Sequence, residues 1–169
     1  MEWMTMPLRR YAEFSGRSRR KEYWMWTLFV FLVYLAFVIL GVALGASAIL
    51  GMSTGSSGGM AAAGGGALIV FGLFFIFVLA ILVPALAVTA RRLHDTNRSG
   101  WWMLLPLVAY PIQIVGAVSN SSILALIGAL VGLGLSILLL VWYCTDGTPG
   151  TNSYGPDPKL RGDGASVSY

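Results

Sequence analysis

Charged residues are scarce in this sequence, and two long segments have none. They make up 11% of the 169 residues, against 57% for hydrophobic residues, whereas about a quarter of the residues of a soluble domain are charged. Residues 23–90 and 99–145 contain no Asp, Glu, Lys or Arg. A soluble fold could not cover its surface with such segments, so the composition predicts an integral membrane protein.

Cysteine and histidine are almost absent. Cys144 is the single cysteine and His94 the single histidine. One cysteine excludes an internal disulfide, and a zinc site needs about three or four ligands. We therefore predict no metal site and no cofactor, and we expect Cys144 to be a small apolar residue near a helix end.

The uncharged segments contain four apolar runs, at residues 24–50, 67–90, 101–118 and 123–144. A bilayer interior accepts only helices or closed barrels, and these runs lack the alternation of barrel strands. They predict an all-α membrane protein with four transmembrane helices. The first run is longer than the apolar part of a signal peptide, about 7–15 residues, so we expect it to be retained. Pro84 interrupts the second run, while Pro106 and Pro111 make the short third run a candidate for a kinked or re-entrant segment.

The basic residues flank alternate ends of the apolar runs. Lys and Arg occur only within residues 9–21, 91–98 and 159–161, and none occurs in residues 51–66 or 119–122. The positive-inside rule therefore predicts that both termini are cytoplasmic. The predicted organisation is a cytoplasmic basic interfacial segment at residues 1–22, a four-helix transmembrane domain at 23–145, and a cytoplasmic tail at 146–169.

The segments outside the spans carry weaker signals. Trp3, Leu8, Tyr11 and Phe14 predict a short amphipathic helix in the membrane interface, with Pro7 in its first turn. The glycine-rich residues 51–66 predict a flexible external connector. The tail is rich in Gly, Pro and Asp, which predicts turns and irregular structure.

Residues 90–102 hold the side chains best suited to chemistry. His94 beside Asp95 could act as an acid or base near neutral pH, and the neighbouring arginines could clamp phosphate or carboxylate. Alternatively, Asp95 and Glu22 pair with arginines and tie the second span to the first. We favour this structural interpretation and predict no catalytic residue, because the sequence shows no nucleophile motif beside His94.

Two further features of the spans are the spacing of their glycines, which bears on packing, and their lack of charge, which bears on transport. Gly41 and Gly45 in the first span, and Gly128 and Gly132 in the fourth, have the spacing of close helix contacts. They predict packing of these two spans against each other or across a dimer. No span contains an ionisable acid or base, so the sequence lacks the usual signature of an ion-coupled carrier.

Three motifs carry a resemblance to a known family. The chain resembles the bacterial inner-membrane proteins grouped as domain of unknown function 805, which implies an inner (plasma) membrane location and no established activity. The first motif comprises Gly16, Arg17, Arg20, Glu22, Tyr23 and Trp24; the second Arg91, Arg92, Leu93, His94, Asp95, Arg98, Ser99, Gly100, Trp101 and Trp102; the third Gly147, Gly150, Asn152, Tyr154, Gly155, Asp157 and Pro158.

All three motifs fall on segments predicted to be cytoplasmic, and they form the candidate binding or structural cluster. We expect Asn152 and Tyr154 to fold back onto Arg17, Arg92 and Asp95. The expected function is a non-enzymatic membrane protein whose Arg/Trp cluster binds a partner protein or anionic lipid head groups, alone or as a homo-oligomer, and not nucleic acid. Two alternatives stay open: a small transporter or channel-forming oligomer, and a membrane enzyme acting on a lipid-linked phosphate.

Overall fold

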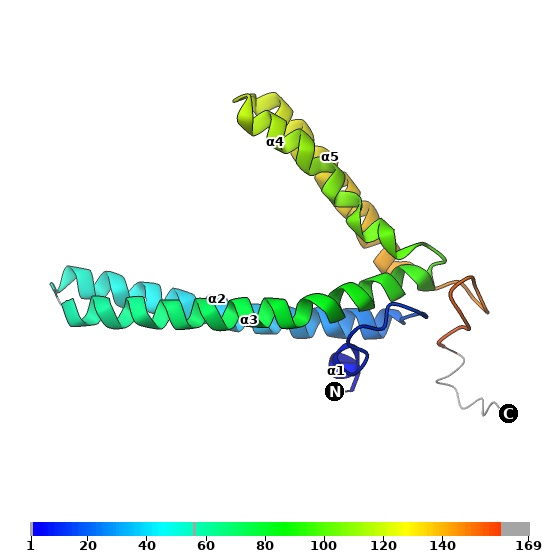
Figure 1. Cartoon of the computed structure of the whole chain (residues 1–169), viewed down its shortest axis with the longest axis horizontal. Helices are drawn as coiled ribbons and strands as arrows, with labels where there is room; N and C mark the ends of the chain where they lie inside the picture. Colours follow the sequence, from blue (N-terminus) through cyan, green and yellow to red (C-terminus); the bar gives the residue numbers. More distant parts are fainter. Residues whose placement is uncertain (1, 56, 160–169) are drawn as a thin grey trace. The chain divides into compact units, whose positions relative to one another are not determined.

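The computed structural model describes residues 2–55 and 57–159, and its regular elements are helices (Figure 1). Four of the helical segments are long and apolar enough to cross a membrane, as predicted. The chain divides into two compact units, residues 1–11 with 24–85 and residues 12–23 with 86–169. The elements are α1 (Glu2–Arg9), α2 (Arg20–Ser53), α3 (Ser57–Asp95), the 3₁₀-helix η1 (Gly100–Ala109), α4 (Tyr110–Val118) and α5 (Ser122–Cys144).

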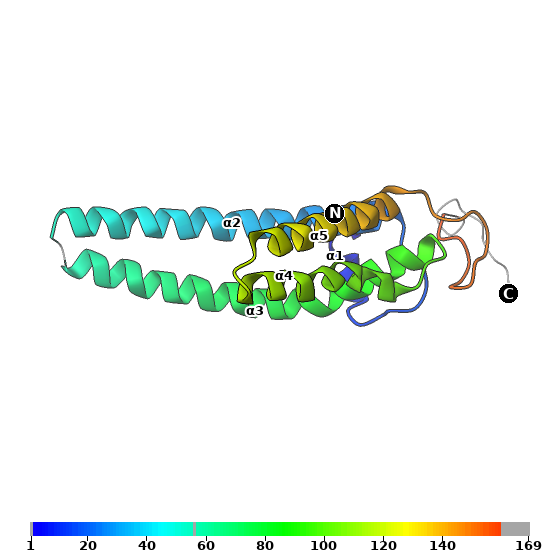
Figure 2. The ribbon, with the colours of Figure 1, turned by 90° about the horizontal axis from the view of Figure 1, so that it is seen from above.

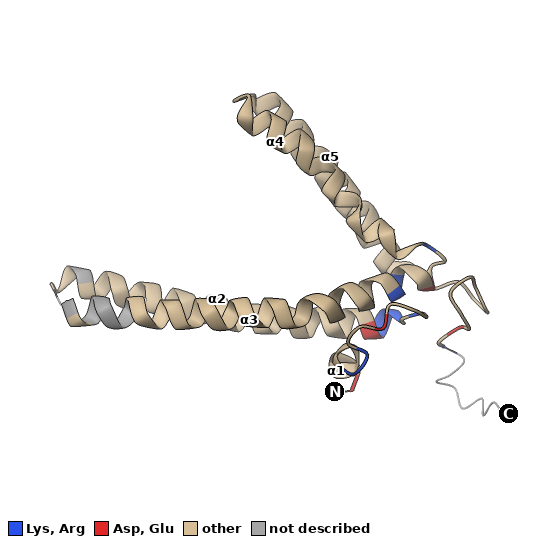
Figure 3. Ribbon diagram, in the orientation of Figure 1, with Lys and Arg blue, Asp and Glu red and all other residues tan. Residues whose placement is uncertain are grey.

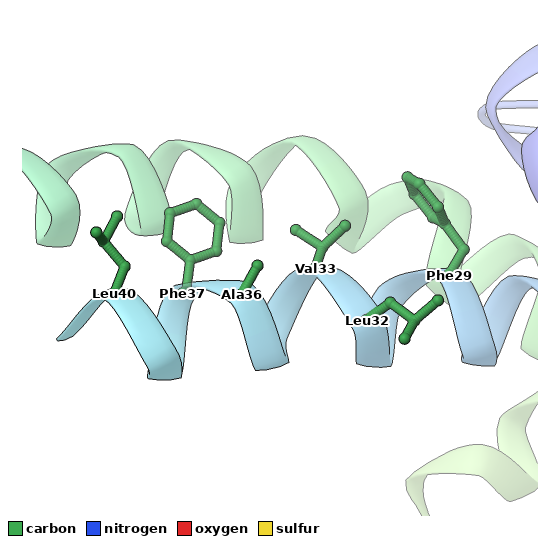
Figure 4. A pocket seen from close by; sticks show the side chains of 6 residues that line it. All are labelled: Phe29, Leu32, Val33, Ala36, Phe37 and Leu40. Atoms are coloured by element: carbon green, nitrogen blue, oxygen red, sulfur yellow. The ribbon is translucent and has the colours of Figure 1, made fainter. Parts of the chain in front are cut away.

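In the first unit, α2 and α3 form an antiparallel hairpin (Figure 2). Aromatic rings join the two helices: Phe37 lies 5.3 Å from Phe74, and Tyr34 lies 6.0 Å from Phe77 in an edge-on arrangement. An apolar groove of about 360 Å³ lies on α2 (Figure 4), and most apolar side chains of the hairpin are exposed, as lipid contact requires. The groove is lined by Phe29, Leu32, Val33, Ala36, Phe37 and Leu40.

Both helices of this hairpin extend well beyond the predicted spans. With 34 and 39 residues, α2 and α3 are about 51 and 58 Å long, whereas a bilayer core is about 30 Å thick. The prediction of a flexible connector at residues 51–66 was therefore wrong. Helix continues through most of that segment, where alanine and methionine favour helix, and the turn is confined to the residues around Gly55, whose φ is +66°.

The N-terminal segment forms α1, but not with the predicted bounds. The helix begins at Glu2, whose negative charge suits a helix N-terminus, and Pro7 lies in the last turn instead of the first. Tyr11 and Phe14 follow the helix. The placement of α1 in the membrane interface stays a prediction.

In the second unit, η1 and α4 together form the third span and pair with α5 (Figure 2). Pro111 starts α4, and Ser99 caps η1 by accepting from the Trp101 amide. A 3₁₀-helix rises about 2 Å per residue, so η1 and α4 together span about 33 Å, close to the roughly 35 Å of α5. As a plain α-helix, the same residues would reach only about 28 Å. The 3₁₀ segment thus compensates for the shortness of the third run.

The glycines of the fourth span pack against the third span. A Cβ on Gly128 would lie 2.6 Å from Gln113 Cγ, and one on Gly132 would lie 3.2 Å from the Ala109 Cβ. The predicted packing of the first and fourth spans against each other or across a dimer stays a prediction, because the two spans belong to different units. Gly41 of α2 has open space at its Cβ position, with no described atom within 4 Å.

Candidate functional site

The charged residues of the described chain lie near helix ends (Figure 3). α2 begins with Arg20 and α3 ends with Asp95, whereas α4 and α5 contain no charged residue. The loop before α2, the last turn of α3 and the tail after α5 all belong to the second unit. Their side chains meet in what we call the ion-pair network, formed by Arg17, Glu22, Arg91, Arg92 and Asp95.

Arg17 enters the network from the loop before α2. The preceding Gly16 has a φ of +83°, a conformation that glycine adopts without a steric penalty. The Arg17 Nε atom lies 2.9 Å from Asp95 Oδ1, and the two side chains are only 1% and 4% exposed. This buried pair joins the loop to the end of α3.

The remaining nitrogens of Arg17 hold the tail. Nη1 donates to the carbonyl oxygens of Gly150 at 2.6 Å and Gly155 at 3.4 Å, while Nη2 donates to that of Thr148 at 2.6 Å. A guanidinium can make these bonds at once because it carries five donors in a planar fork. The tail therefore wraps around a single arginine side chain.

Arg91 and Arg92 reach different carboxylates from the last turns of α3. Arg91 Nη2 lies 2.9 Å from Glu22 Oε1, and Arg92 Nη1 lies 2.5 Å from Asp95 Oδ2. Successive residues of an α-helix point about 100° apart, which sends the two guanidiniums in different directions. The predicted pairing of Glu22 and Asp95 with arginines is confirmed, and it ties the start of α2 to the end of α3.

Arginines also cap the carboxyl end of α5. Arg92 donates through Nε to the Tyr143 carbonyl at 3.1 Å and through Nη2 to that of Thr145. Arg20 donates to the Cys144 carbonyl at 3.1 Å. The last carbonyls of a helix lack intrahelical partners and carry partial negative charge, so cationic donors are favoured there.

The network is buried to an unusual degree. Arg91 and Arg92 are the two largest fully buried side chains of the described chain, a position that hydrophobic residues normally occupy. Three arginines face two carboxylates, so the network has one positive charge in excess (3 − 2). The main-chain carbonyls of the tail and of α5 accept from the arginines and offset that excess. Loss of one partner from such a set is costly, because it leaves an uncompensated buried charge.

The tail packs on His94 through Asn152 and Tyr154. The Tyr154 ring is stacked on the imidazole, with centroids 3.9 Å apart and planes at 4°. Asn152 Nδ2 donates to the His94 carbonyl at 2.9 Å. The tail thus folds back onto Arg17 and the end of α3, and the side chains of Asn152 and Tyr154 themselves contact His94. Arg17 and Asp95 meet the tail through its main chain, in hydrogen bonds with Gly150 and Thr148.

Turns shape the tail, as predicted. Asn152 and Gly155 exchange two main-chain hydrogen bonds of 3.1 and 3.2 Å, and Gly155 has a φ of +132°. Gly147 lies against the ion-pair network, where a Cβ would fall 2.2 Å from Asp95 Oδ2. Any side chain at position 147 would therefore displace the tail or Asp95.

His94 and Asp95 do not form an acid–base pair. His94 Nδ1 lies 3.2 Å from the Gly16 carbonyl oxygen, while the two oxygens of Asp95 are bound by Arg17 and Arg92. Arg91 and Arg92 are fully buried, which fits the favoured structural interpretation better than a clamp for an external phosphate. Among the described residues, no three side chains of the metal-binding types gather in one place.

Two further residues of the second motif, Arg98 and Trp102, contact Trp142 of α5, apart from the ion-pair network. The Arg98 guanidinium lies over the Trp142 ring, 4.5 Å from its centroid, and Trp102 meets Trp142 edge-on at 5.8 Å. Gly100 is buried, and a Cβ there would lie 2.9 Å from the Ala90 Cβ. Trp101, by contrast, is 78% exposed, so the structure places it outside the ion-pair network.

Tyr23 and Trp24 lie where α2 begins. The Tyr23 ring packs at 4.8 Å from that of Tyr143 near the end of α5, which joins two helix ends within the second unit. Trp24 is partly exposed. Aromatic residues of this kind favour the membrane–water boundary.

Beside the ion-pair network lies a polar pocket of about 430 Å³, which we call the basic pocket. Asp146 is its exposed carboxylate, with Oδ1 2.7 Å from Arg20 Nη2 and 3.0 Å from Lys159 Nζ. The pKa of the Asp146 carboxyl lies below its ordinary value, because the hydrogen bond from Lys159 favours the ionised form and the charge of Arg20 adds to this effect. The pocket is lined by Arg19, Arg20, Lys21, Asp95, Asp146, Gly147 and Lys159.

Comparison with known proteins places the chain in a family. The family model described as Protein of unknown function (DUF805) matches residues 11–156. The chain belongs to this family. The ion-pair network lies wholly within the matched residues, and so do the tail contacts of His94. The resemblance inferred from the three motifs is thereby confirmed.

Individual DUF805 relatives cover nearly the whole chain. Inner membrane protein YhaI of Escherichia coli K12 is 36% identical over 160 residues, which span 95% of this chain and 98% of YhaI. Inner membrane protein YhaH of the same strain is 36% identical over 161 residues, 95% of this chain and 99% of YhaH. No solved structure matches the chain. Together with the four apolar helices, these relatives identify the DUF805 chain as a multi-pass inner-membrane protein.

Sequence reasoning did not single out several residues of this site. Arg19 donates through Nε to the Pro158 carbonyl at 2.7 Å, and Lys159 reaches Asp146, so both basic residues join the tail to the pocket. The only sequence signal for them was their charge, which the topology rule already explained. Trp142, the partner of Arg98, lies within the fourth apolar run and carried no signal of its own in the sequence.

Proposed function

We propose that this DUF805 protein is a non-enzymatic inner-membrane protein with both termini in the cytoplasm, whose cytoplasmic surface binds anionic lipid head groups. The observation that carries the proposal is the difference in burial between two sets of basic residues. Arg17, Arg91 and Arg92 are buried and paired internally, whereas Arg20 and Lys159 have side chains that are 47% and 54% exposed. The exposed basic residues lie where α2 begins and α5 ends.

The ion-pair network supports the topology independently of the charge rule. Arg17 precedes α2, Asp95 ends α3 and Thr148 follows α5, yet all three are in hydrogen-bond contact. These contacts support the placement of the three segments on one side of the membrane. The absence of basic residues from 51–66 and 119–122 favours the cytoplasm for that side.

Electrostatics favours lipid head groups as the partner. Anionic head groups attract basic residues at the cytoplasmic surface by about 1 kcal/mol each. The residues that line the basic pocket are charged except for Gly147, whereas protein interfaces usually bury an apolar centre. The arrangement therefore suits a charged head group better than a folded protein.

The proposal is tested with the full-length protein in nanodiscs of mixed composition. We expect phosphatidylglycerol to be enriched around the protein relative to phosphatidylcholine, with the enrichment falling as salt rises. Mass spectrometry of lipids that remain bound after mild detergent extraction measures the preference. Equal retention of both lipids would reject lipid binding, and stoichiometric retention of an acidic protein instead would identify the other class of partner.

A further inference from the structure

The basic pocket has the size and lining of a small-molecule site. Its volume of about 430 Å³ lies within the range of about 300–1,000 Å³ typical of ligand pockets. The residues just before and at the start of α2 form one part of its lining, and the tail after α5 forms another. A ligand there would contact two segments that are far apart in the sequence.

The charge of the pocket is unbalanced. Four of its lining residues are basic and two are acidic, a difference of +2 (4 − 2). One of the two carboxylates, Asp95, is already neutralised by Arg17 and Arg92. Asp146 is then the one carboxylate that faces the basic side chains of the pocket.

The Asp146 carboxylate lies between two cationic side chains. Its Oδ1 atom accepts from Lys159 Nζ at 3.0 Å and lies 2.7 Å from Arg20 Nη2. All three side chains are about half exposed, at 55%, 54% and 47%. Exposed ion pairs contribute little stability, so an external anion with more oxygen atoms can displace this carboxylate at small cost.

We propose that the basic pocket binds a phosphate ester, with Arg20 and Lys159 as its phosphate ligands and Asp146 as an exchangeable internal counter-ion. This inference deepens the proposed function and rests on it, because it names the site at which a head group binds. The phosphate oxygens take the position of the Asp146 carboxylate, which turns outward to solvent. Arg19 and Lys21 line the same pocket and add to its positive potential.

Either a lipid or a soluble compound can supply the phosphate. Tyr23 packs on Tyr143 close to the pocket residues Arg20 and Lys21, at the ends of two membrane helices, so a head group in the inner leaflet is within reach. Two probes separate the sources: short-chain phosphatidylglycerol, and glycerol phosphate without acyl chains. Short-chain phosphatidylcholine serves as the zwitterionic control.

The test measures binding of each probe to the purified full-length protein by native mass spectrometry. Lys159→Gln removes a phosphate ligand, and we expect about tenfold weaker binding of the phosphatidylglycerol probe. Asp146→Asn removes the competing carboxylate, and we expect binding that is several-fold tighter. Arg9→Gln is the matched control, since it removes the same charge outside the pocket and should leave the affinity nearly unchanged.

The outcomes distinguish the proposal for the basic pocket from the proposed function in lipid binding. If Asp146→Asn binds no more tightly than wild type, or if Lys159→Gln and Arg9→Gln weaken binding equally, the pocket proposal is overturned. Should the protein still enrich anionic lipid in nanodiscs, the proposed function survives that result. If glycerol phosphate binds in the pocket but anionic lipid is not enriched, the site stands and the lipid function fails. Thermal unfolding of each variant establishes that it is folded.

Discussion

The hydroxyl of Tyr11 donates a hydrogen bond of 2.9 Å to the main-chain carbonyl of Ala80. In an α-helix that carbonyl would accept from the amide of residue 84, but residue 84 is a proline, which has no N–H. Pro84 lies within the continuous helix α3. Tyr11 thus supplies the donor that Pro84 removes, which matters in a membrane, where an unpaired carbonyl has no water to replace it.

This relationship predicts a coupled mutational effect. Tyr11→Phe should lower the free energy of unfolding by about 1–2 kcal/mol, because it leaves the Ala80 carbonyl without a partner. In a Pro84→Ala background the new amide restores the helical bond, and Tyr11→Phe should then have little effect. Unfolding of the four proteins in mixed detergent micelles measures the coupling; additive effects would show that the two residues act independently.

The ion-pair network predicts that loss of a buried carboxylate lowers the stability of the protein more than loss of an exposed one. Asp95→Asn leaves Arg17 and Arg92 buried without their counter-charge and should destabilise the protein by about 3–5 kcal/mol. Asp146→Asn removes a carboxylate that is exposed to solvent and should change the unfolding transition very little. Similar transitions for the two variants would mean that the network is solvated and not buried.

The close approach of Gly147 to Asp95 predicts that a side chain at position 147 is destabilising. Gly147→Ala would put a methyl group within 2.2 Å of Asp95 Oδ2, so it should cost about 1–3 kcal/mol and loosen the tail. Gly134→Ala in α5 is the matched control, because no described atom lies within 4 Å of its Cβ position and alanine favours helix. Limited proteolysis of the tail, with thermal unfolding, compares the two; equal protection of both tails would contradict the close contact.

The pairing of α4 with α5 predicts where small residues are required. A Cβ on Gly116 would lie 2.5 Å from the Ala125 nitrogen, so Gly116→Ala should destabilise the protein by about 1–3 kcal/mol, as should Gly128→Ala. Gly41→Ala and Gly45→Ala face open space and should be neutral in the monomer. If the α2 variants instead change the oligomeric state, those glycines form a contact between two copies of the chain.

The topology predicts the outcome of reporter fusions. Alkaline phosphatase inserted in the turn at Gly55 should be active, because that turn is predicted to be external. Fluorescent protein fused after Tyr169, or inserted in the loop at Asn97, should fluoresce, because it folds in the cytoplasm. Activity of alkaline phosphatase at the C-terminus would contradict the model of both termini inside.

Much of the architecture could be predicted from the sequence. Four apolar runs without charge determine four membrane helices, since insertion depends on the summed transfer free energy of a segment and little on its neighbours. The pairing of Glu22 and Asp95 with arginines was predictable for a similar reason, because a carboxylate beside a membrane helix needs a cation. The pattern could not show that helix occupies most of the glycine-rich residues 51–66, with a turn only around Gly55, because glycine is typical of flexible segments.

The composition therefore determined the class of protein, and the order of apolar and charged residues along the sequence determined the number of helices able to span a membrane. Only the tertiary structure decided which arginines are structural. Arg17, Arg19 and Arg20 are near neighbours in the sequence, yet Arg17 is buried against Asp95 whereas Arg20 lies at the exposed rim of a pocket. Burial depends on contacts with residues from α3 and from the tail after α5, which lie far away along the chain. A local pattern of charge does not contain that information.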